Sequence, residues 1–238
     1  MRARPLQYRG RPVLAVLFDL DGTLIDSVRD VALALNRGLA DSDLPPVPLQ
    51  SVRDFVGRGA PLLVERALEA QGLQLDAPSK AALLARFTQH YQDLLERDES
   101  QAAPYEGAQQ ALRELRECGS RLAVVTNKPQ QLALGALAKV GLLQSVDTVV
   151  GGGICERGKP DPQPLLFACG ALQVQAAEAL MVGDSLHDVA AARAAGMPVV
   201  CVPYGYNEGQ DPRSLPCDDF IERLDQLPDL LTSISYRT

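Results

Sequence analysis

The stretch Val13-Leu-Ala-Val-Leu-Phe-Asp19-Leu-Asp21-Gly-Thr-Leu24 decides how the rest of the chain is interpreted. Its branched apolar residues, 13–18, are typical of a strand that is buried on both faces of a parallel sheet. Side chains two apart in an extended chain point the same way, so Asp19 and Asp21 face one spot at the carboxyl end of that strand. Active sites of open α/β sheets lie at this end. Two like charges held together there favour a divalent cation, although an Asp-Gly pair also suits an ordinary turn.

The composition indicates a globular protein that can bury a substantial core. The chain has 238 residues, of which 46% are hydrophobic and 22% are charged. Its formal net charge of -7 argues against nucleic acid or an anionic membrane as a partner and leaves a small metabolite. Five cysteines without a C-x-x-C pair, an N-terminus unlike a signal peptide and no apolar run of membrane-spanning length favour the cytoplasm. Whether the protein is a monomer or a homodimer stays open.

The order of the predicted elements indicates two domains. Residues 26–99 show helical periodicity without a convincing strand, and Ser27 with Asp30 resembles a capping box at the first helix. From residue 100 onward, strands and helices alternate, as in a parallel, doubly wound sheet. We therefore predict a Rossmann-like α/β core, residues 1–25 and 100–238, with an inserted all-helical cap domain, residues 26–99. We call the latter the helical insert.

Polar side chains follow four of the predicted strands. Taken singly, each of these residues also has a purely structural explanation, as part of a turn, as a surface lysine or as a helix N-cap. They are Asp19 and Asp21, then Thr126 and Asn127, then Lys159, and finally Asp184, Ser185 and Asp188. Several carboxylates suit Mg²⁺, which prefers hard oxygen ligands. Lys159 and the metal would neutralise phosphate oxygens while the Thr126 hydroxyl orients them, so the set predicts phosphoryl transfer.

These motifs resemble the four motifs of the haloacid dehalogenase-like hydrolase superfamily, and the resemblance extends over essentially the whole chain. The matching positions are Asp19-Leu-Asp21-Gly-Thr23, Thr126, Lys159 and Gly183-Asp184-Ser185-x-x-Asp188. The resemblance implies that Asp19 is the nucleophile, which forms an aspartyl-phosphate, and that Asp21 protonates the leaving alkoxide and then activates water. It implies Mg²⁺ bound by Asp19, the Asp21 backbone carbonyl and Asp184, with Asp188 supporting these ligands or binding through water. It also implies that the helical insert closes over the substrate.

Two further segments resemble bacterial phosphoglycolate phosphatases. Phe55-Val-Gly-Arg-Gly-Ala60 lies in the helical insert, and Tyr204-Gly-Tyr-Asn-Glu-Gly209 follows a late strand, where an ordinary turn is an equal explanation. Arg58 stands where Asn is more typical, and its cation could meet a substrate carboxylate. The resemblance implies release of phosphate from 2-phosphoglycolate, with Thr126, Asn127, Lys159 and Arg58 binding the substrate. We interpret His187 as a helix-surface residue.

Three alternatives remain open from the sequence. The first is a phosphatase of the same build that acts on a sugar phosphate or pyrophosphate, and the second is a phosphosugar mutase. The third is a non-catalytic scaffold, which the complete set of carboxylates and lysine disfavours. The acid at Asp21 favours phosphate esters over haloacids, and Thr23 stands where mutases of this superfamily typically carry Val.

Overall fold

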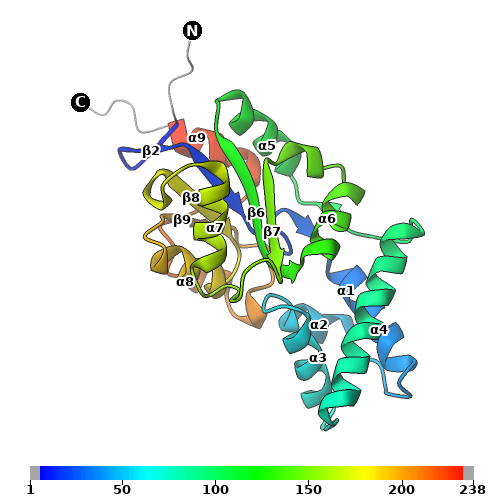
Figure 1. Ribbon diagram of the computed structural model, residues 1–238. Helices are drawn as coiled ribbons and strands as arrows, with labels where there is room; N and C mark the ends of the chain where they lie inside the picture. Colours follow the sequence, from blue (N-terminus) through cyan, green and yellow to red (C-terminus); the bar gives the residue numbers. More distant parts are fainter. Residues whose placement is uncertain (1–5, 233–238) are drawn as a thin grey trace.

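A six-stranded parallel sheet forms the centre of the computed structural model, which describes residues 6–232 (Figure 1). The strands lie in the order β10-β9-β8-β3-β6-β7, and every neighbouring pair is parallel. Their bounds are β3 (Ala15–Phe18), β6 (Arg121–Pro129), β7 (Thr148–Gly152), β8 (Ala179–Gly183), β9 (Val199–Cys201) and β10 (Asp219–Phe220). This sheet confirms the predicted α/β class.

Helices cover both faces of the sheet, which makes it doubly wound. One face packs against α5 (Ala108–Glu117), α6 (Gln130–Lys139) and α9 (Leu227–Thr232), and the other against α7 (Gln163–Leu172) and α8 (Leu186–Ala194). In β3, Val16 and Phe18 join the first apolar cluster while Ala15 and Leu17 join the second. Because side chains alternate along a strand, a strand buried on both faces must be apolar throughout.

The segment between Asp26 and Ala103 contains four helices and no strand, all within the described residues. They are α1 (Val28–Ala40), α2 (Leu49–Phe55), α3 (Ala60–Glu69) and α4 (Ala77–Glu96), and they share an apolar cluster of their own. The chain enters and leaves this segment through β4 (Ile25–Asp26) and β5 (Ala103–Pro104), which pair antiparallel. The bundle lies beyond one end of the sheet, connected to it at this pair (Figure 1).

The first strand begins later than predicted. Val13 ends a hairpin formed by β1 (Leu6–Tyr8) and β2 (Arg11–Val13), and Leu14 is 37% exposed, so β3 starts at Ala15. A single strand over 13–18 was therefore the wrong expectation, because hairpin pairing claims its first residue. The outermost parts of the predicted core, residues 1–5 and 233–238, lie outside the described residues.

Short 3₁₀ turns complete the chain. They are η1 (Leu143–Ser145), η2 (Ala176–Glu178), η3 (Asn207–Gly209), η4 (Pro212–Ser214) and η5 (Leu224–Gln226). Within residues 6–232, no helix combines the length and apolar character that crossing a membrane requires. The five cysteines, all described, are free thiols.

Candidate active site

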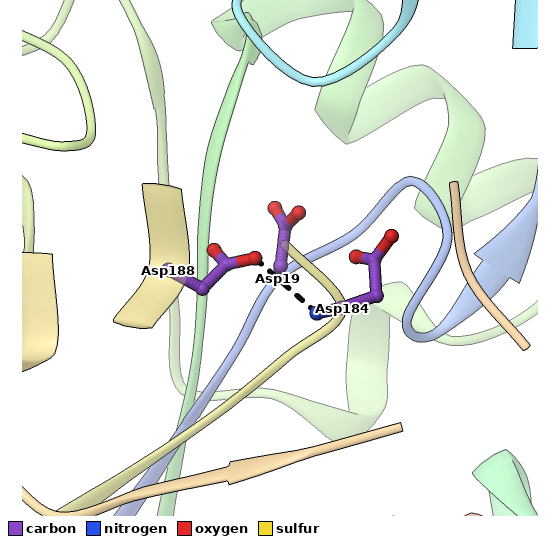
Figure 2. A group of neighbouring side chains, drawn as sticks. All are labelled: Asp19, Asp184 and Asp188. Carbon is purple, nitrogen blue, oxygen red and sulfur yellow. Dashed lines mark hydrogen bonds between the residues drawn. The ribbon is translucent and has the colours of Figure 1, made fainter. Parts of the chain in front are cut away.

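Three buried carboxylates meet at the carboxyl edge of the sheet (Figure 2). Asp19 follows β3, Asp184 follows β8, and Asp188 lies in the first turn of α8. One carboxylate oxygen from each lies within 4.8 Å of the others. In Figure 2, Asp19 lies between the other two side chains. Together with Lys159 we call these residues the carboxylate cluster.

Lys159 reaches two of the three acids from the loop between β7 and α7. Its Nζ donates a hydrogen bond of 2.6 Å to Asp188 Oδ1 and lies 2.8 Å from Asp19 Oδ1. The contact with Asp19 is an ion pair without hydrogen-bond geometry, so Asp19 Oδ1 has no hydrogen-bond partner among the described residues. The Lys159 side chain is only 2% exposed. A buried carboxylate oxygen without a donor leaves room for another positive partner.

Backbone and hydroxyl donors hold Asp188 in place. Ser185 is the N-cap of α8, and Asp188 Oδ2 accepts hydrogen bonds from the Ser185 hydroxyl (2.6 Å) and the Ser185 backbone N–H (3.1 Å). The N–H of Asp184 adds a longer bond to the same oxygen, drawn as a dashed line in Figure 2. The capping interaction at the start of a helix thus also orients an active-site acid.

Asp184 is held by donors from two other loops. It accepts 2.8 Å hydrogen bonds from the Thr23 hydroxyl and from the backbone N–H of Tyr206. A Cβ at Gly22 would lie 2.3 Å from the Asp184 carboxylate, and one at Gly205 would lie 2.2 Å from atoms of the same side chain. Only glycine allows the two loops to approach this acid so closely.

The carboxylate cluster favours a proton or a cation. Burial, reinforced by the charge of Asp188, raises the pKa of Asp19 to about 7. Burial, together with the charges of Asp19 and Asp188, raises the pKa of Asp184 to about 8. Burial lowers the pKa of Lys159, but the charges of Asp188 and Asp19 outweigh it and raise the pKa overall. Three acids around one lysine leave an excess of negative charge.

These observations fit Mg²⁺. The donors are hard carboxylate oxygens, one of them without a hydrogen-bond partner, and the charge of one lysine does not balance three acids. The structure brings together Asp19, Asp184 and Asp188 but not the carboxylate of Asp21, for which we expected only a backbone contribution. Asp188 is already bonded to Lys159 and Ser185, which agrees with a supporting position.

The side chain of Asp21 belongs to a second group of residues. Its carboxylate accepts hydrogen bonds from the Lys128 ammonium at 3.1 and 3.2 Å and from the Ser27 hydroxyl. The Lys128 Nζ also lies 4.2 Å from the centre of the Tyr91 ring, which belongs to α4 of the helical insert. We call Asp21, Ser27, Lys128 and Tyr91 the Asp21 cluster. It contains one acid and one base, so its charges balance.

The predicted capping box at α1 is wrong. The Ser27 hydroxyl makes no capping bond and instead donates to Asp21, while the Asp30 carboxylate accepts from the Ser100 hydroxyl and the Gln101 backbone N–H. Ser27 therefore bonds to a residue of the preceding loop, and Asp30 bonds to residues about 70 positions later in the chain. A local sequence pattern cannot anticipate such competition, because it depends on how the insert joins the core.

Thr126 and Asn127 lie within β6, near its carboxyl end, and not after the strand as predicted; their side chains face different surroundings. Thr126 is buried, whereas Asn127 donates 3.0 Å hydrogen bonds to the carbonyls of Gly57 and Lys159 and accepts one from the Lys159 N–H. Asn127 therefore connects the helical insert to the lysine loop.

A cavity of about 40 Å³ lies between the sheet edge and the helical insert. A single water needs about 10–15 Å³ on this measure, so the space has room for about three waters. The core contributes its polar wall and the insert most of its apolar wall. The lining residues are Asp19, Asp21, Val31, Val56, Gly57, Gly59, Ala60, Leu63, Phe87, Thr126, Asn127, Lys128, Pro129 and Leu132.

Arg58 lies outside this cavity. It lines a neighbouring groove of about 320 Å³, which also contains Thr126, Asn127 and Lys159. Its side chain is 43% exposed, and its Nε lies 4.0 Å from a carboxylate oxygen of Glu208. The structure thus brings Arg58 near three of the predicted substrate-binding residues, but not against Asp21.

The segment 204–209 does more than form a turn. The Tyr206 hydroxyl accepts hydrogen bonds from the N–H groups of Ser27 and Val28 and donates one to Asp26, at the junction with the helical insert. Arg53 of α2 lies over the Tyr206 ring, 5.1 Å from its centre. His187 lies in the first turn of α8, where its side chain is 12% exposed and its Nε2 lies 3.2 Å from a carboxylate oxygen of Glu208.

Sequence reasoning missed Lys128, although a signal for it was present. The observed β6 continues to Pro129, three residues beyond the predicted end. Alternation then places Thr126 and Lys128 on the same side of the strand, and both are buried. A longer strand would therefore have placed a lysine in the site.

Comparison with known proteins agrees with the geometry. The family model described as haloacid dehalogenase-like hydrolase matches residues 16–202. The chain is 46% identical to a plasmid-encoded phosphoglycolate phosphatase of Cupriavidus necator, covering 93% of this chain and 94% of that one. It is 40% identical to a phosphoglycolate phosphatase of Nitrosospira multiformis, covering 94% and 98%. A crystal structure of a predicted phosphoglycolate phosphatase from Haemophilus somnus superposes with a TM-score of 0.85 at 30% identity, covering 92% and 97%. The chain belongs to the haloacid dehalogenase-like hydrolases.

Proposed function

We propose that this hydrolase releases phosphate from 2-phosphoglycolate in a Mg²⁺-dependent reaction. The observation that carries the proposal is the buried Asp19, which faces Lys159 at 2.8 Å and shares its surroundings with Asp184 and Asp188. Such a site suits a phosphate group, and the similar proteins named above are phosphoglycolate phosphatases. A cavity lined by Asp19, Asp21 and Thr126 adjoins this group and lies under the helical insert.

In the first step, a carboxylate oxygen of Asp19 attacks the phosphorus atom. The bond between phosphorus and the ester oxygen breaks. Asp21 enters this step protonated, not as the carboxylate paired with Lys128, and gives its proton to that oxygen, so glycolate leaves and an aspartyl-phosphate remains. Lys159 stabilises the charge on the phosphate oxygens, while the Thr126 hydroxyl and backbone N–H groups orient them. Bound Mg²⁺ would add positive charge at the same oxygens.

In the second step, Asp21 takes a proton from water as the water oxygen attacks the phosphorus. The bond between Asp19 and the phosphorus breaks, which restores the Asp19 carboxylate and releases phosphate. Asp21 ends the cycle with the proton it lost in the first step. Its contact with Lys128 and Ser27 keeps the carboxylate at the cavity wall while it is ionised, between the two steps.

The helical insert, residues 26–99, would act as the lid over this chemistry. Its side chains Val31, Val56, Leu63 and Phe87 line the apolar wall of the cavity, opposite the acids of the core. Excluding bulk water strengthens the electrostatic contacts inside and protects the acyl phosphate from premature attack. The antiparallel pair β4–β5 gives the insert two adjacent connections about which it can move. The five free cysteines also suit a cytoplasmic setting.

Rates on a panel of phosphorylated compounds test the substrate. We expect the highest kcat/KM for 2-phosphoglycolate when it is compared with sugar phosphates and pyrophosphate, with free phosphate measured as product. A clearly higher value for a sugar phosphate or pyrophosphate would contradict the proposal. Isomerised sugar phosphate without phosphate release would indicate a mutase, in which the phosphoryl group returns to the substrate.

A further inference from the structure

We propose that Lys128 binds the carboxylate of the substrate and so selects 2-phosphoglycolate among phosphate esters. This inference rests on the proposed function and assigns the part of the substrate that the phosphate-binding residues do not touch. Lys128 is buried at the end of β6 and lines the cavity, and its ammonium group lies beside Asp21.

The charges that line the cavity support this assignment. The acids Asp19 and Asp21 line it, and among the described lining residues Lys128 is the one cation. Most of the remaining wall is apolar, including Leu63 and Phe87. A carboxylate that enters such a space loses its water shell and needs a cationic hydrogen-bond donor in exchange. Lys128 is the lining side chain that can provide it.

Lys128 also has donor capacity to spare. A lysine ammonium carries three N–H donors, and the two hydrogen bonds of Lys128 both go to the carboxylate of Asp21, which leaves one donor for a substrate. Lys159, in contrast, lies against both Asp19 and Asp188. The Tyr91 ring, 4.2 Å from the Lys128 Nζ, stabilises the ammonium through a cation–π contact without using its charge in an ion pair.

The chemistry of the substrate requires a cation at this position. In 2-phosphoglycolate, the carboxylate and the ester oxygen are bonded to the same carbon atom. Because Asp21 must reach the ester oxygen to protonate it, the carboxylate has to lie close to the Asp21 side chain. The Lys128 Nζ is 3.1 Å from an Asp21 oxygen. The cation and the acid are therefore as close together as the two substrate groups that they would contact.

Arg58 is less suitable for this role. Its guanidinium points toward Glu208, which also pairs with Arg66 at 3.0 Å, and it lines the outer groove rather than the cavity. An arginine in that place can attract anions, but it does not adjoin the acid that acts on the ester oxygen. Arg58 therefore offers a matched control, since it is a cation near the same site.

Ethyl phosphate isolates the carboxylate, because it replaces that group of 2-phosphoglycolate with a methyl group. We expect Lys128→Met and Lys128→Gln to lose at least about tenfold more kcat/KM on 2-phosphoglycolate than on ethyl phosphate. Arg58→Ala should leave the ratio of the two substrates within about threefold. If the Met variant does not fold, the Gln variant, which can still donate to Asp21, provides the test.

Binding gives a readout that is independent of turnover. In an Asp19→Asn background with Mg²⁺, Lys128→Gln should weaken calorimetric binding of 2-phosphoglycolate by about tenfold and leave that of ethyl phosphate nearly unchanged. Equal losses on both compounds would overturn the inference and make Lys128 a support for Asp21 only. A changed ratio in Arg58→Ala but not in the Lys128 variants would also overturn it. The proposed function itself is tested with the wild-type protein alone. It fails if another compound of the panel has a higher kcat/KM than 2-phosphoglycolate.

Discussion

The carboxylate cluster and the Asp21 cluster both reach the same cavity, yet they differ in charge and in origin. In the first, three acids surround Lys159, and all four residues come from the core. In the second, Asp21 and Lys128 form a balanced pair, and the helical insert contributes Ser27 and Tyr91. An excess of negative charge calls for an added cation. A balanced pair needs none and instead depends on where the insert lies.

The two clusters also differ in the elements that hold their side chains in place. The carboxylate cluster is held by strand ends and the start of α8, so it should persist when the insert moves. The Asp21 cluster is complete only when α4 and the start of α1 are seated, because Tyr91 and Ser27 arrive with them. The proposed acid–base group is thereby assembled together with the helical insert, whereas the carboxylate cluster is assembled with the sheet.

The largest expected effect comes from removing Asp19, the proposed nucleophile, from the carboxylate cluster. Asp19→Asn should lower phosphate release from 2-phosphoglycolate by about 10⁴-fold or more, because an amide oxygen cannot replace the attacking carboxylate. The variant should fold without loss of stability, since it removes one of three crowded acids. Activity assays and thermal unfolding check both points. More than a trace of retained activity would place the nucleophile elsewhere.

A smaller effect concerns folding stability, which should depend on pH and Mg²⁺ through the carboxylate cluster. The raised pKa values of Asp19 and Asp184, about 7 and about 8, mean that the metal-free folded protein retains protons that the unfolded chain loses near pH 4. That contribution to stability is complete below about pH 4 and disappears as the pH rises through 7 to 8. Mg²⁺ can replace the protons, so it should raise Tm more at pH 8 than at pH 6.

Mg²⁺ at about 100 times its Kd should add about 2.7 kcal/mol to the free energy of unfolding, or about 5–10 °C in Tm for a chain of this length. Thermal scans at a fixed metal concentration provide the measurement, with Asp184→Asn as the control that should flatten the pH dependence. An equal gain in Tm at both pH values would show that the cluster does not exchange protons for the metal.

The smallest expected effect concerns two buried tyrosines on the insert side. The Tyr206 hydroxyl satisfies the backbone N–H groups of Ser27 and Val28, so Tyr206→Phe should lower the free energy of unfolding by about 1–3 kcal/mol. The Tyr91 hydroxyl has no hydrogen-bond partner within residues 6–232, and Tyr91→Phe should change stability by less than about 0.5 kcal/mol. Urea unfolding of both variants checks the contrast. Equal losses would mean that ring packing, rather than the hydrogen bonds, holds the insert.

The predictable part of the site follows strand ends. Asp19, Thr126 and Asp184 each come at the end of an apolar run, and Lys159 lies in the loop that follows another strand, so parallel strands bring all four toward one edge of the sheet. The prediction was poorer for side chains with a choice of partners. The Ser27 hydroxyl had a plausible local role as a cap, in which its oxygen would accept from a backbone N–H. In the structure it instead donates a charge-assisted hydrogen bond to the Asp21 carboxylate.

The sequence by itself determined the class of fold, the helical nature of the insert and the residues of the carboxylate cluster, because these depend on periodicity and on the common direction of parallel strands. The tertiary structure alone decided which side chains face Asp21, that Lys128 rather than Arg58 lines the cavity, and that Tyr206 joins Asp184 to the insert. Those contacts join residues distant in the chain, and they depend on how the helical insert, with its own apolar cluster, lies against the sheet. No local pattern encodes that arrangement.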